Sequence, residues 1–170
     1  MLKEFSVRYV ILGHSERRQY QKESDALISK KALAAHAASL KPIMCVGETL
    51  AERVASQTEK VLETQVRGSL AGLSKEQMEE TIVAYEPVWA IGSGKTATTR
   101  QAQDAHAFIR QRLAEMFDET VARRVRIQYG GSVKPANARE LMSQPDVDGA
   151  LVGGAALEPR SFAEIIKNSI

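Results

Sequence analysis

Short apolar runs alternate with longer amphipathic segments along this chain of 170 residues. Strands of four or five residues that alternate with helices are typical of βα units and a parallel sheet, here with starts about 35 residues apart. Five runs are expected to be buried strands, at residues 8–12, 42–46, 81–85, 125–128 and 149–152. The pattern therefore predicts a single α/β domain over residues 1–170, or one piece of such a domain.

The segments between these runs carry apolar residues at helical spacing. The first segment begins at Ser24, whose hydroxyl oxygen is a favourable N-cap, and has an acid in its first turn. The next two long segments repeat an apolar face every three or four residues. Helices are therefore expected at 24–40, 52–70, 99–117, 137–142 and 161–168.

Two parallel architectures fit this alternation, the open doubly wound sheet and the closed (β/α)8 barrel. The doubly wound sheet predicts a G-x-G-x-x-G turn after the first strand, but the first run is followed by GHSE at residues 13–16. Polar or glycine residues instead recur at successive strand ends, namely His14, Gly47-Glu48, Glu86, Gly130-Gly131-Ser132 and Gly153-Gly154. A barrel builds its site at these carboxyl ends, so the pattern favours a barrel.

Composition and charge exclude several classes of protein. The 23 basic and 21 acidic residues are interspersed and leave a net charge of +2, so no nucleic-acid partner is expected. The N-terminal apolar run is too short for a signal peptide or a membrane span, and no membrane partner is expected. The only cysteine, Cys45, lies in a strand run, where it is interpreted as a buried hydrophobe, and a lone thiol suits a reducing compartment. A cytoplasmic protein is expected.

The three histidines show no metal-ligand spacing, and neither H-x-x-x-H nor C-x-x-C occurs, so no metal is expected. His36 and His106 fall in the middle of helical segments, where a structural role is expected. His14 instead follows the first strand and precedes the first turn of a helix. The helix dipole disfavours an imidazolium there, and a neutral ring can donate a hydrogen bond to a carbonyl. A histidine that merely satisfies the strand end is the alternative.

Glu86 follows the third strand and precedes Pro87, which disfavours a helix at Glu86 and removes one backbone donor. The apolar segment 88–91 comes next. If it folds over the carboxylate, with Leu151 as a candidate second wall, desolvation raises the proton affinity of Glu86 and makes it a better base toward a carbon acid. In isolation, a strand-end cap or an ion-pair partner is an equally open interpretation.

Three glycine-rich segments suggest an anion site. The first, Gly92-Ser93-Gly94, can present backbone N–H groups. It continues into Lys95-Thr96, but a P-loop needs a glycine at the position of Trp89, so a nucleotide site loses most of its support. The glycines after the last two strands, followed by a short helix at 155–157, match the phosphate site of barrels.

Five segments, in order, resemble the triosephosphate isomerase family. They lie at 9–18, 45–49, 84–96, 128–133 and 148–154 and read YVILGHSERR, CVGET, AYEPVWAIGSGKT, QYGGSV and DGALVGG. The sequence EPVWAIG within them is highly specific. The resemblance implies a TIM (β/α)8 barrel, here an incomplete barrel of about five βα units.

The resemblance also implies an activity, the interconversion of dihydroxyacetone phosphate and D-glyceraldehyde 3-phosphate in glycolysis and gluconeogenesis. The reaction passes through an enediolate and needs no cofactor. On the matching positions, Glu86 would be the base, His14 the neutral electrophile, and Glu16 the acid that neighbours the family's catalytic lysine. The phosphate of the small triose substrate would be bound by Gly92, Ser132, Gly153 and Gly154.

A mobile lid after the third strand is implied as well, and its closure excludes water. Trp89 would lie at the hinge, and Ile91 would pack over the carboxylate with Leu151. Tyr129 and Ser132 would bond to the closed form. The lid and its support would comprise Pro87, Trp89, Ile91, Lys95, Thr96, Tyr129 and Leu151.

The sequence departs from the family in its missing units. The complete barrel has eight βα units in about 250 residues, and the first run here matches the family's fourth strand. The opening strand with its Asn-x-Lys pattern is absent, as is the loop by which the family forms homodimers. We therefore expect two open edges with exposed apolar surface, a tendency to associate, and little or no activity of this chain alone.

Two alternatives come from other classes. The chain is a non-catalytic remnant or phosphate-binding module of the same fold if it binds a phosphorylated triose without turnover. A nucleotide-binding P-loop protein is the weaker alternative, and stabilisation by ATP would distinguish it.

Overall fold

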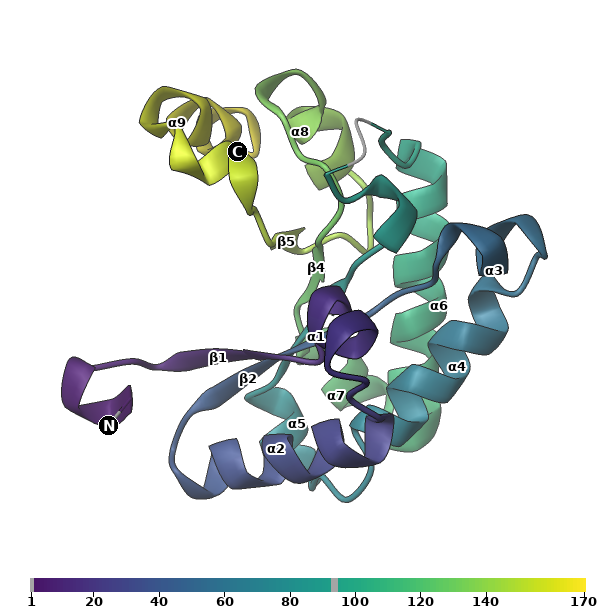
Figure 1. The fold of residues 1–170 in the computed structure, drawn as a ribbon, viewed down its shortest axis with the longest axis vertical. Helices are drawn as coiled ribbons and strands as arrows, with labels where there is room; N and C mark the ends of the chain where they lie inside the picture. Colours follow the sequence, from purple (N-terminus) through teal and green to yellow (C-terminus); the bar gives the residue numbers. More distant parts are fainter. Residues whose placement is uncertain (1, 93–94) are drawn as a thin grey trace.

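The computed structural model describes residues 2–92 and 95–170. Five parallel strands form one sheet in the order β1-β2-β3-β4-β5 (Figure 1). They are β1 (Tyr9–Leu12), β2 (Lys41–Val46), β3 (Ile82–Tyr85), β4 (Ile127–Tyr129) and β5 (Gly149–Ala150). All five predicted strands are confirmed, with bounds that differ from the prediction by at most two residues.

Helices connect the strands and surround one face of the sheet. The α-helices are α1 (Ser15–Tyr20), α2 (Asp25–Ala37), α3 (Leu50–Val54), α4 (Thr58–Ser69), α5 (Lys75–Glu79), α6 (Thr99–Met116), α7 (Glu119–Arg124), α8 (Pro135–Met142) and α9 (Pro159–Asn168). The 3-10 helices are η1 (Leu2–Phe5), η2 (Val88–Ala90) and η3 (Gly154–Leu157). The longer helices contact one another in chain order, α2 with α4, α4 with α6, α6 with α8, and α8 with α9. This arrangement confirms an incomplete (β/α)8 barrel.

Local capping explains where the long helices begin. The Ser24 side chain accepts a hydrogen bond from the Leu27 N–H (3.3 Å), as predicted for the start of α2. A capping box between Thr98 and Gln101 starts α6. Pro159 occupies the first turn of α9, where its missing N–H costs no helical bond.

The single helix predicted over 52–70 is wrong. The structure divides this region into α3 and α4, with Ser56 between them in the left-handed conformation at φ +56°. A capping box between Thr49 and Glu52 starts α3. The break turns Val54 out to solvent, whereas Leu62 on α4 is fully buried. The two short helices α5 and α7 were not predicted, because helices of this length depend on packing against each other and against α6.

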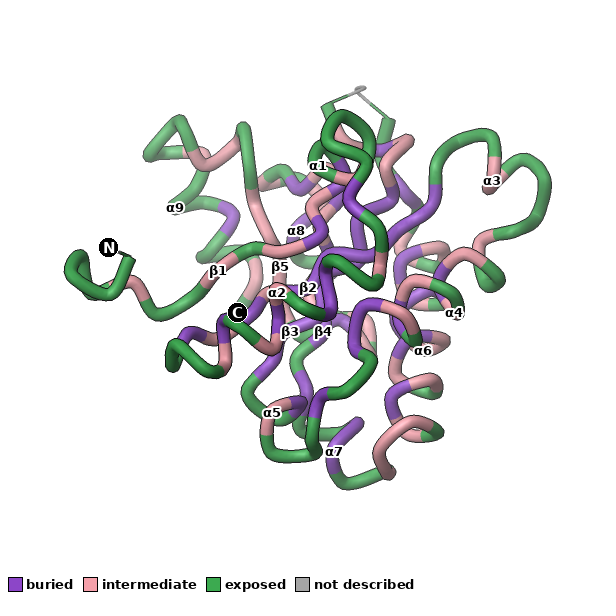
Figure 2. Tube along the Cα trace, turned by 60° about the horizontal axis from the view of Figure 1, so that its bottom comes forward, coloured by how far each residue is buried: buried purple, intermediate pink, exposed green. Residues whose placement is uncertain are grey.

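Burial is concentrated in the middle of the sheet, as Figure 2 shows for the strands near its centre. Every residue of β3 is buried, whereas β1 alternates between exposed and half-buried positions. Tyr9 is 42% exposed and Ile11 45% exposed on this edge strand. The predicted exposure of apolar surface at the open edges is therefore confirmed.

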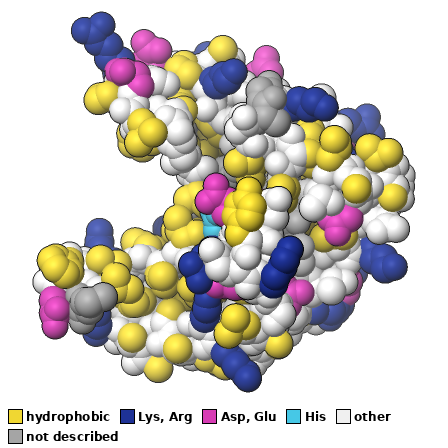
Figure 3. All heavy atoms as spheres, viewed as in Figure 1, with side chains coloured by type: hydrophobic (Ala, Val, Ile, Leu, Met, Phe, Trp, Pro, Cys, Tyr) yellow, Lys and Arg dark blue, Asp and Glu magenta, His cyan; other side chains and the backbone are white. Residues whose placement is uncertain are grey.

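The opposite edge is also uncovered. A groove of about 370 Å³ lies between β5, α8 and α9, and exposed Phe162, Ile166 and Ile170 contribute to its lining. Figure 3 shows the molecule hollowed between the N-terminal segment and α9. In the part of the chain that the structure describes, the search for a helix long and apolar enough to cross a membrane finds none.

Candidate active site

A buried carboxylate stands at the end of the central strand. Glu86 is 3% exposed, and its Oε2 accepts a hydrogen bond from the Ser15 N–H at 2.9 Å. Its Oε1 lies 3.0 Å from Nε2 of His14. Burial raises the pKa of Glu86, and the opposing effects of His14, the Ser15 N–H, Cys45 and Arg18 are smaller. The side chain is therefore a stronger base than an exposed glutamate.

His14 pairs with Glu86 in a defined tautomer. As N-cap of α1, its Nδ1 accepts a hydrogen bond from the Glu16 N–H at 3.3 Å. Because Nδ1 accepts, hydrogen bonding assigns the proton of a neutral ring to Nε2, which donates toward Glu86. The Glu16 side chain itself is exposed. The structure thus brings together the two residues expected to carry the chemistry.

Two glycines allow the backbone to close around Glu86. A Cβ on Gly47 would lie 1.8 Å from the Glu86 carbonyl oxygen, and one on Gly130 would lie 2.9 Å from Glu86 Cγ. The Glu86 N–H donates to the Val46 carbonyl at 2.7 Å, and the Gly130 N–H donates to the Tyr85 carbonyl at 2.7 Å. Side chains at either glycine would displace the base.

A second carboxylate, Glu48, organises the segment after Glu86. It is fully buried and accepts hydrogen bonds from the Tyr85 hydroxyl (3.1 Å), Trp89 Nε1 (2.9 Å) and Arg53 (3.1 Å). The Arg53 guanidinium also lies 4.9 Å from the Trp89 ring centroid. Trp89 is therefore bonded to Glu48, and the hinge role that the resemblance implies for it stays a prediction. The strand-end position of Glu48 was the only sequence signal for this role.

Arg18 is a further residue that the sequence did not reveal. Its guanidinium donates to the carbonyl oxygens of Gly13 (2.8 Å) and Cys45 (3.1 Å) and pairs with Asp25 at 2.6 Å. These bonds tie the carboxyl ends of β1 and β2 to the start of α2. They fix the strand end from which His14 reaches Glu86.

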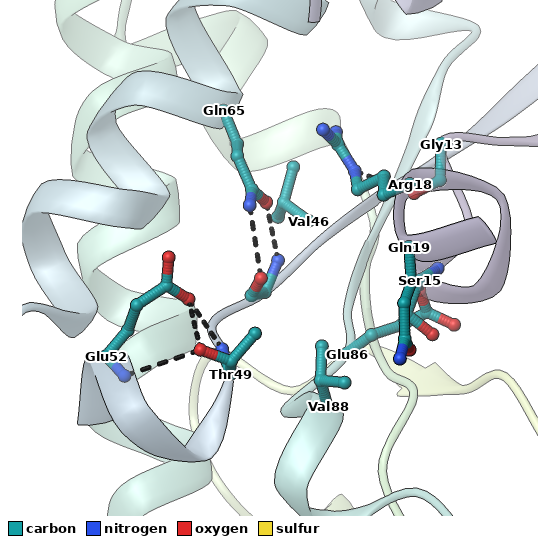
Figure 4. Close-up of a pocket in the computed structure, with 11 residues that line it drawn as sticks. Gly13, Ser15, Arg18, Gln19, Val46, Thr49, Glu52, Gln65, Glu86 and Val88 are labelled. Carbon is teal, nitrogen blue, oxygen red and sulfur yellow. Dashed lines mark hydrogen bonds between the residues drawn. The ribbon is translucent and has the colours of Figure 1, made fainter. Parts of the chain in front are cut away.

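A cavity of about 220 Å³ lies beside Glu86 (Figure 4). On its wall, the Gln65 amide makes two hydrogen bonds to the backbone of Gly47, at 2.7 and 3.1 Å. The cavity is lined by Gly13, Ser15, Arg18, Gln19, Val46, Gly47, Thr49, Glu52, Gln65, Glu86 and Val88. Val88 is the residue of the apolar segment 88–91 that lines this cavity together with Glu86.

A second cavity, of about 240 Å³, has five glycines among its lining residues and is called the glycine-walled cavity here. Its lining includes all four predicted phosphate-binding residues, Gly92, Ser132, Gly153 and Gly154. A Cβ placed on any of these three glycines would meet open space, and Gly92 has φ +64°. Gly130 also lines this cavity and contacts Glu86, so the base and the glycine-lined space are adjacent.

Ile91 and Leu151 both line the glycine-walled cavity, as their expected pairing requires, but neither lines the cavity beside Glu86. Ser132 is bonded to the segment after Glu86, since its N–H and Oγ donate to the Ala90 carbonyl at 3.1 and 2.7 Å. The Tyr129 hydroxyl is buried and has no hydrogen-bond partner among the described residues, so its expected bond to the closed form stays a prediction. Burial raises the pKa of Tyr129.

The structure describes only part of the glycine-rich segment 92–96. Ser93 and Gly94, part of the expected anion-binding segment, lie outside the described residues. Lys95 and Thr96 are exposed. Across residues 2–92 and 95–170, no group of three His, Cys, Asp or Glu side chains is arranged to hold a metal ion.

The sheet order and these strand-end side chains define a parallel α/β barrel, incomplete here, whose site pairs a buried carboxylate with an imidazole beside a glycine-walled cavity. The family model described as triosephosphate isomerase matches residues 1–169. The chain belongs to the triosephosphate isomerase family.

Proteins named triosephosphate isomerase from three bacteria illustrate the similarity. The protein from Rhodopirellula baltica is 59% identical over 167 residues, which are 98% of this chain and 66% of the relative. The one from Moorella thermoacetica is 61% identical over 166 residues, with 98% and 66% covered. The one from Carboxydothermus hydrogenoformans is 56% identical over 170 residues, with 100% and 68% covered. The chain thus spans about two thirds of the length of these relatives.

Proposed function

We propose that this chain supplies the base and the electrophile of an isomerase that interconverts dihydroxyacetone phosphate and D-glyceraldehyde 3-phosphate in glycolysis and gluconeogenesis. The observation that carries the proposal is the 3.0 Å contact between the buried Glu86 carboxylate and Nε2 of His14. A carbon acid next to a carbonyl needs both a strong base and a hydrogen-bond donor to the oxygen. The pair supplies both.

In the proposed reaction, ionised Glu86 removes a proton from the carbon beside the carbonyl. The electron pair of that C–H bond forms the enediolate double bond, and the carbonyl π electrons move to oxygen. The Nε2–H of His14 donates a hydrogen bond to that oxygen. The hydroxyl proton on the first carbon passes by way of the His14 ring to the oxygen of the second carbon. Glu86 returns its proton to the second carbon, and the enediolate electrons re-form a carbonyl at the first carbon, so no external oxidant or reductant is required.

The substrate's phosphate is proposed to bind in the glycine-walled cavity. Gly92, Ser132, Gly153 and Gly154 line it, and Gly92, Gly153 and Gly154 leave room for a group at their backbone. Backbone N–H groups are suitable donors to phosphate oxygens. Contact between Gly130 and Glu86 sets the phosphate close to the base, as a three-carbon substrate requires.

Turnover is proposed to depend on protein that covers the open edges. The apolar groove at β5 and the exposed residues of β1 leave the site open to water, and the family's lysine strand is missing from this sequence. Alone, the chain is expected to be inactive and to associate through these edges. The test is an isomerase assay of the chain, verified as 170 residues by mass, with and without the N-terminal third of the Moorella relative. Activity only in the mixture supports the proposal, and turnover by the chain alone contradicts its dependence on closure.

A phosphate-binding module without catalysis is the second candidate. It is favoured by the glycine-walled cavity, which needs no further strand to form. Binding of a phosphorylated triose by a mixture that shows no isomerase activity would select this alternative over the enzyme.

A further inference from the structure

His106 is a fully buried histidine on α6 that the proposed reaction does not use. Its Nδ1 lies 2.7 Å from the Ala102 carbonyl oxygen, so Nδ1 carries the proton and donates it. Its Nε2 is buried without a hydrogen-bond partner among the described residues. Burial lowers the pKa of His106 to about 4, so the ring is neutral at physiological pH. A buried acceptor without a partner calls for an explanation.

The ring of His106 packs against two tyrosines. It meets Tyr85 edge-on, with ring centroids 5.6 Å apart and planes at 86°, and it lies 6.2 Å from the Tyr129 ring. The two tyrosine rings are themselves 6.4 Å apart. Each ring of this aromatic triad (Tyr85, His106 and Tyr129) therefore supports the other two. A change in the position of one ring displaces its neighbours.

The hydroxyl group of Tyr85 links the triad to the segment that follows Glu86. It donates a hydrogen bond to Glu48, the carboxylate that also accepts a hydrogen bond from Trp89 Nε1. The Tyr129 hydroxyl is buried and has no hydrogen-bond partner among the described residues. The triad thus connects α6 to Trp89 through Tyr85 and Glu48.

We propose that His106 is a positioning residue for the segment that follows Glu86, because its ring holds Tyr85 in the orientation from which the Tyr85 hydroxyl bonds to Glu48, the carboxylate that also binds Trp89. The inference rests on the proposed function, in which Glu86 is the base. The Nδ1–H bond to Ala102 fixes the ring on α6, and the ring edge fixes Tyr85. Loss of the ring loosens the hold of Glu48 on Trp89.

Fluorescence of Trp89, the only tryptophan of the 170 residues, provides a test that needs no substrate. His106→Leu removes the ring and is expected to increase acrylamide quenching of Trp89 about twofold, well below the melting transition. His106→Phe keeps a ring but loses the Nδ1–H bond to Ala102, and its quenching is expected to lie between those of the parent and His106→Leu. His36→Leu is the matched control, since His36 lies on α2 and contacts Thr81 at 3.0 Å.

A role in global stability alone would lower the melting temperature and leave this quenching unchanged. The proposal is overturned if folded His106→Leu matches His36→Leu in quenching. If His106→Leu does not fold, the parent chain labelled with 15N-histidine is titrated with inorganic sulfate. Ring resonances of His106 should then shift while those of His36 stay fixed, and equal behaviour of both overturns the proposal. In a uniformly 15N-labelled sample, backbone amide resonances of Gly153 and Gly154 that do not move would instead show that the proposed phosphate site does not bind sulfate.

Discussion

The central strand β3 and the edge strand β1 both deliver a residue to the site, but they are covered very differently. β3 is buried at every position and ends at Glu86, whereas β1 exposes Tyr9 and Ile11 to solvent. The carboxyl end of β1 is nevertheless fixed, because Arg18 bonds to the carbonyl of Gly13. The difference shows that the chemical groups are held by local bonds at strand ends. Enclosure of the substrate, in contrast, depends on protein that covers the edge strands β1 and β5.

The largest effect should follow from removing the base on β3. In the mixture with the N-terminal third of a relative, Glu86→Gln should lower kcat by about 10²–10⁴-fold, the usual contribution of a general base. Glu80→Gln is the control, because Glu80 is an exposed partner of Lys41 far from the strand ends that form the site. Equal activity of the two variants in a steady-state assay would show that Glu86 is not the base.

Removing the residue delivered by β1 should have a somewhat smaller effect. His14→Gln keeps an N–H donor but not the geometry of Nε2, and it should lower kcat by about 10²–10³-fold with little change in KM. His36→Gln, on the outer helix α2, should leave both constants unchanged. A change confined to KM would assign His14 to substrate binding instead.

Matched isoleucines on an inner and an edge strand test the difference in coverage directly. Ile127 on β4 is fully buried, and Ile127→Ala should lower the free energy of unfolding by about 2–5 kcal/mol. Ile11 on β1 is 45% exposed, and Ile11→Ala should change it by less than about 0.5 kcal/mol. Urea unfolding measures both values. Similar losses would mean that the edge is covered in solution, for example by self-association.

The smallest expected effect concerns the stability cost of the buried base. The raised pKa means that folded Glu86 holds its proton more tightly than unfolded Glu86 does. The stability that protonated Glu86 contributes is therefore present at low pH and is lost as pH rises through the pKa of folded Glu86. Glu86→Gln should raise the melting temperature by about 2–4 °C near neutral pH, equivalent to about 1 kcal/mol. The gain should vanish near pH 4, about the pKa of an unfolded glutamate. A pH-independent change would contradict the cause we assign.

The sequence predicted the sheet better than it predicted the contacts of the site. Strand runs such as Ile82–Tyr85 are apolar and bounded by turn residues, so local pattern identifies them. The break at Ser56 was missed, because one serine in the left-handed conformation leaves no periodic signal. The cluster on Glu48 was missed for another reason. Its donors come from β3, η2 and α3, and only the folded chain brings them together.

Resemblance and geometry contributed different parts of the site. His14 and Glu86 were identified from their strand-end positions and from family motifs, and the structure places them in contact. The hydrogen bond from Trp89 to Glu48 was not predicted, since an apolar sequence does not reveal a buried hydrogen-bond acceptor such as Glu48. Side-chain partners across the barrel depend on distances that the sequence does not contain.

The most direct test of the central claim, that this chain assembles the base and its partner before its edges are covered, is 15N NMR of the histidine side chains in the chain alone. The account predicts that Nε2 of His14 carries a proton whose resonance is shifted by the hydrogen bond to Glu86, and that Glu86→Gln removes this shift. A His14 ring that exchanges between tautomers, or that does not respond to Glu86→Gln, would contradict the account.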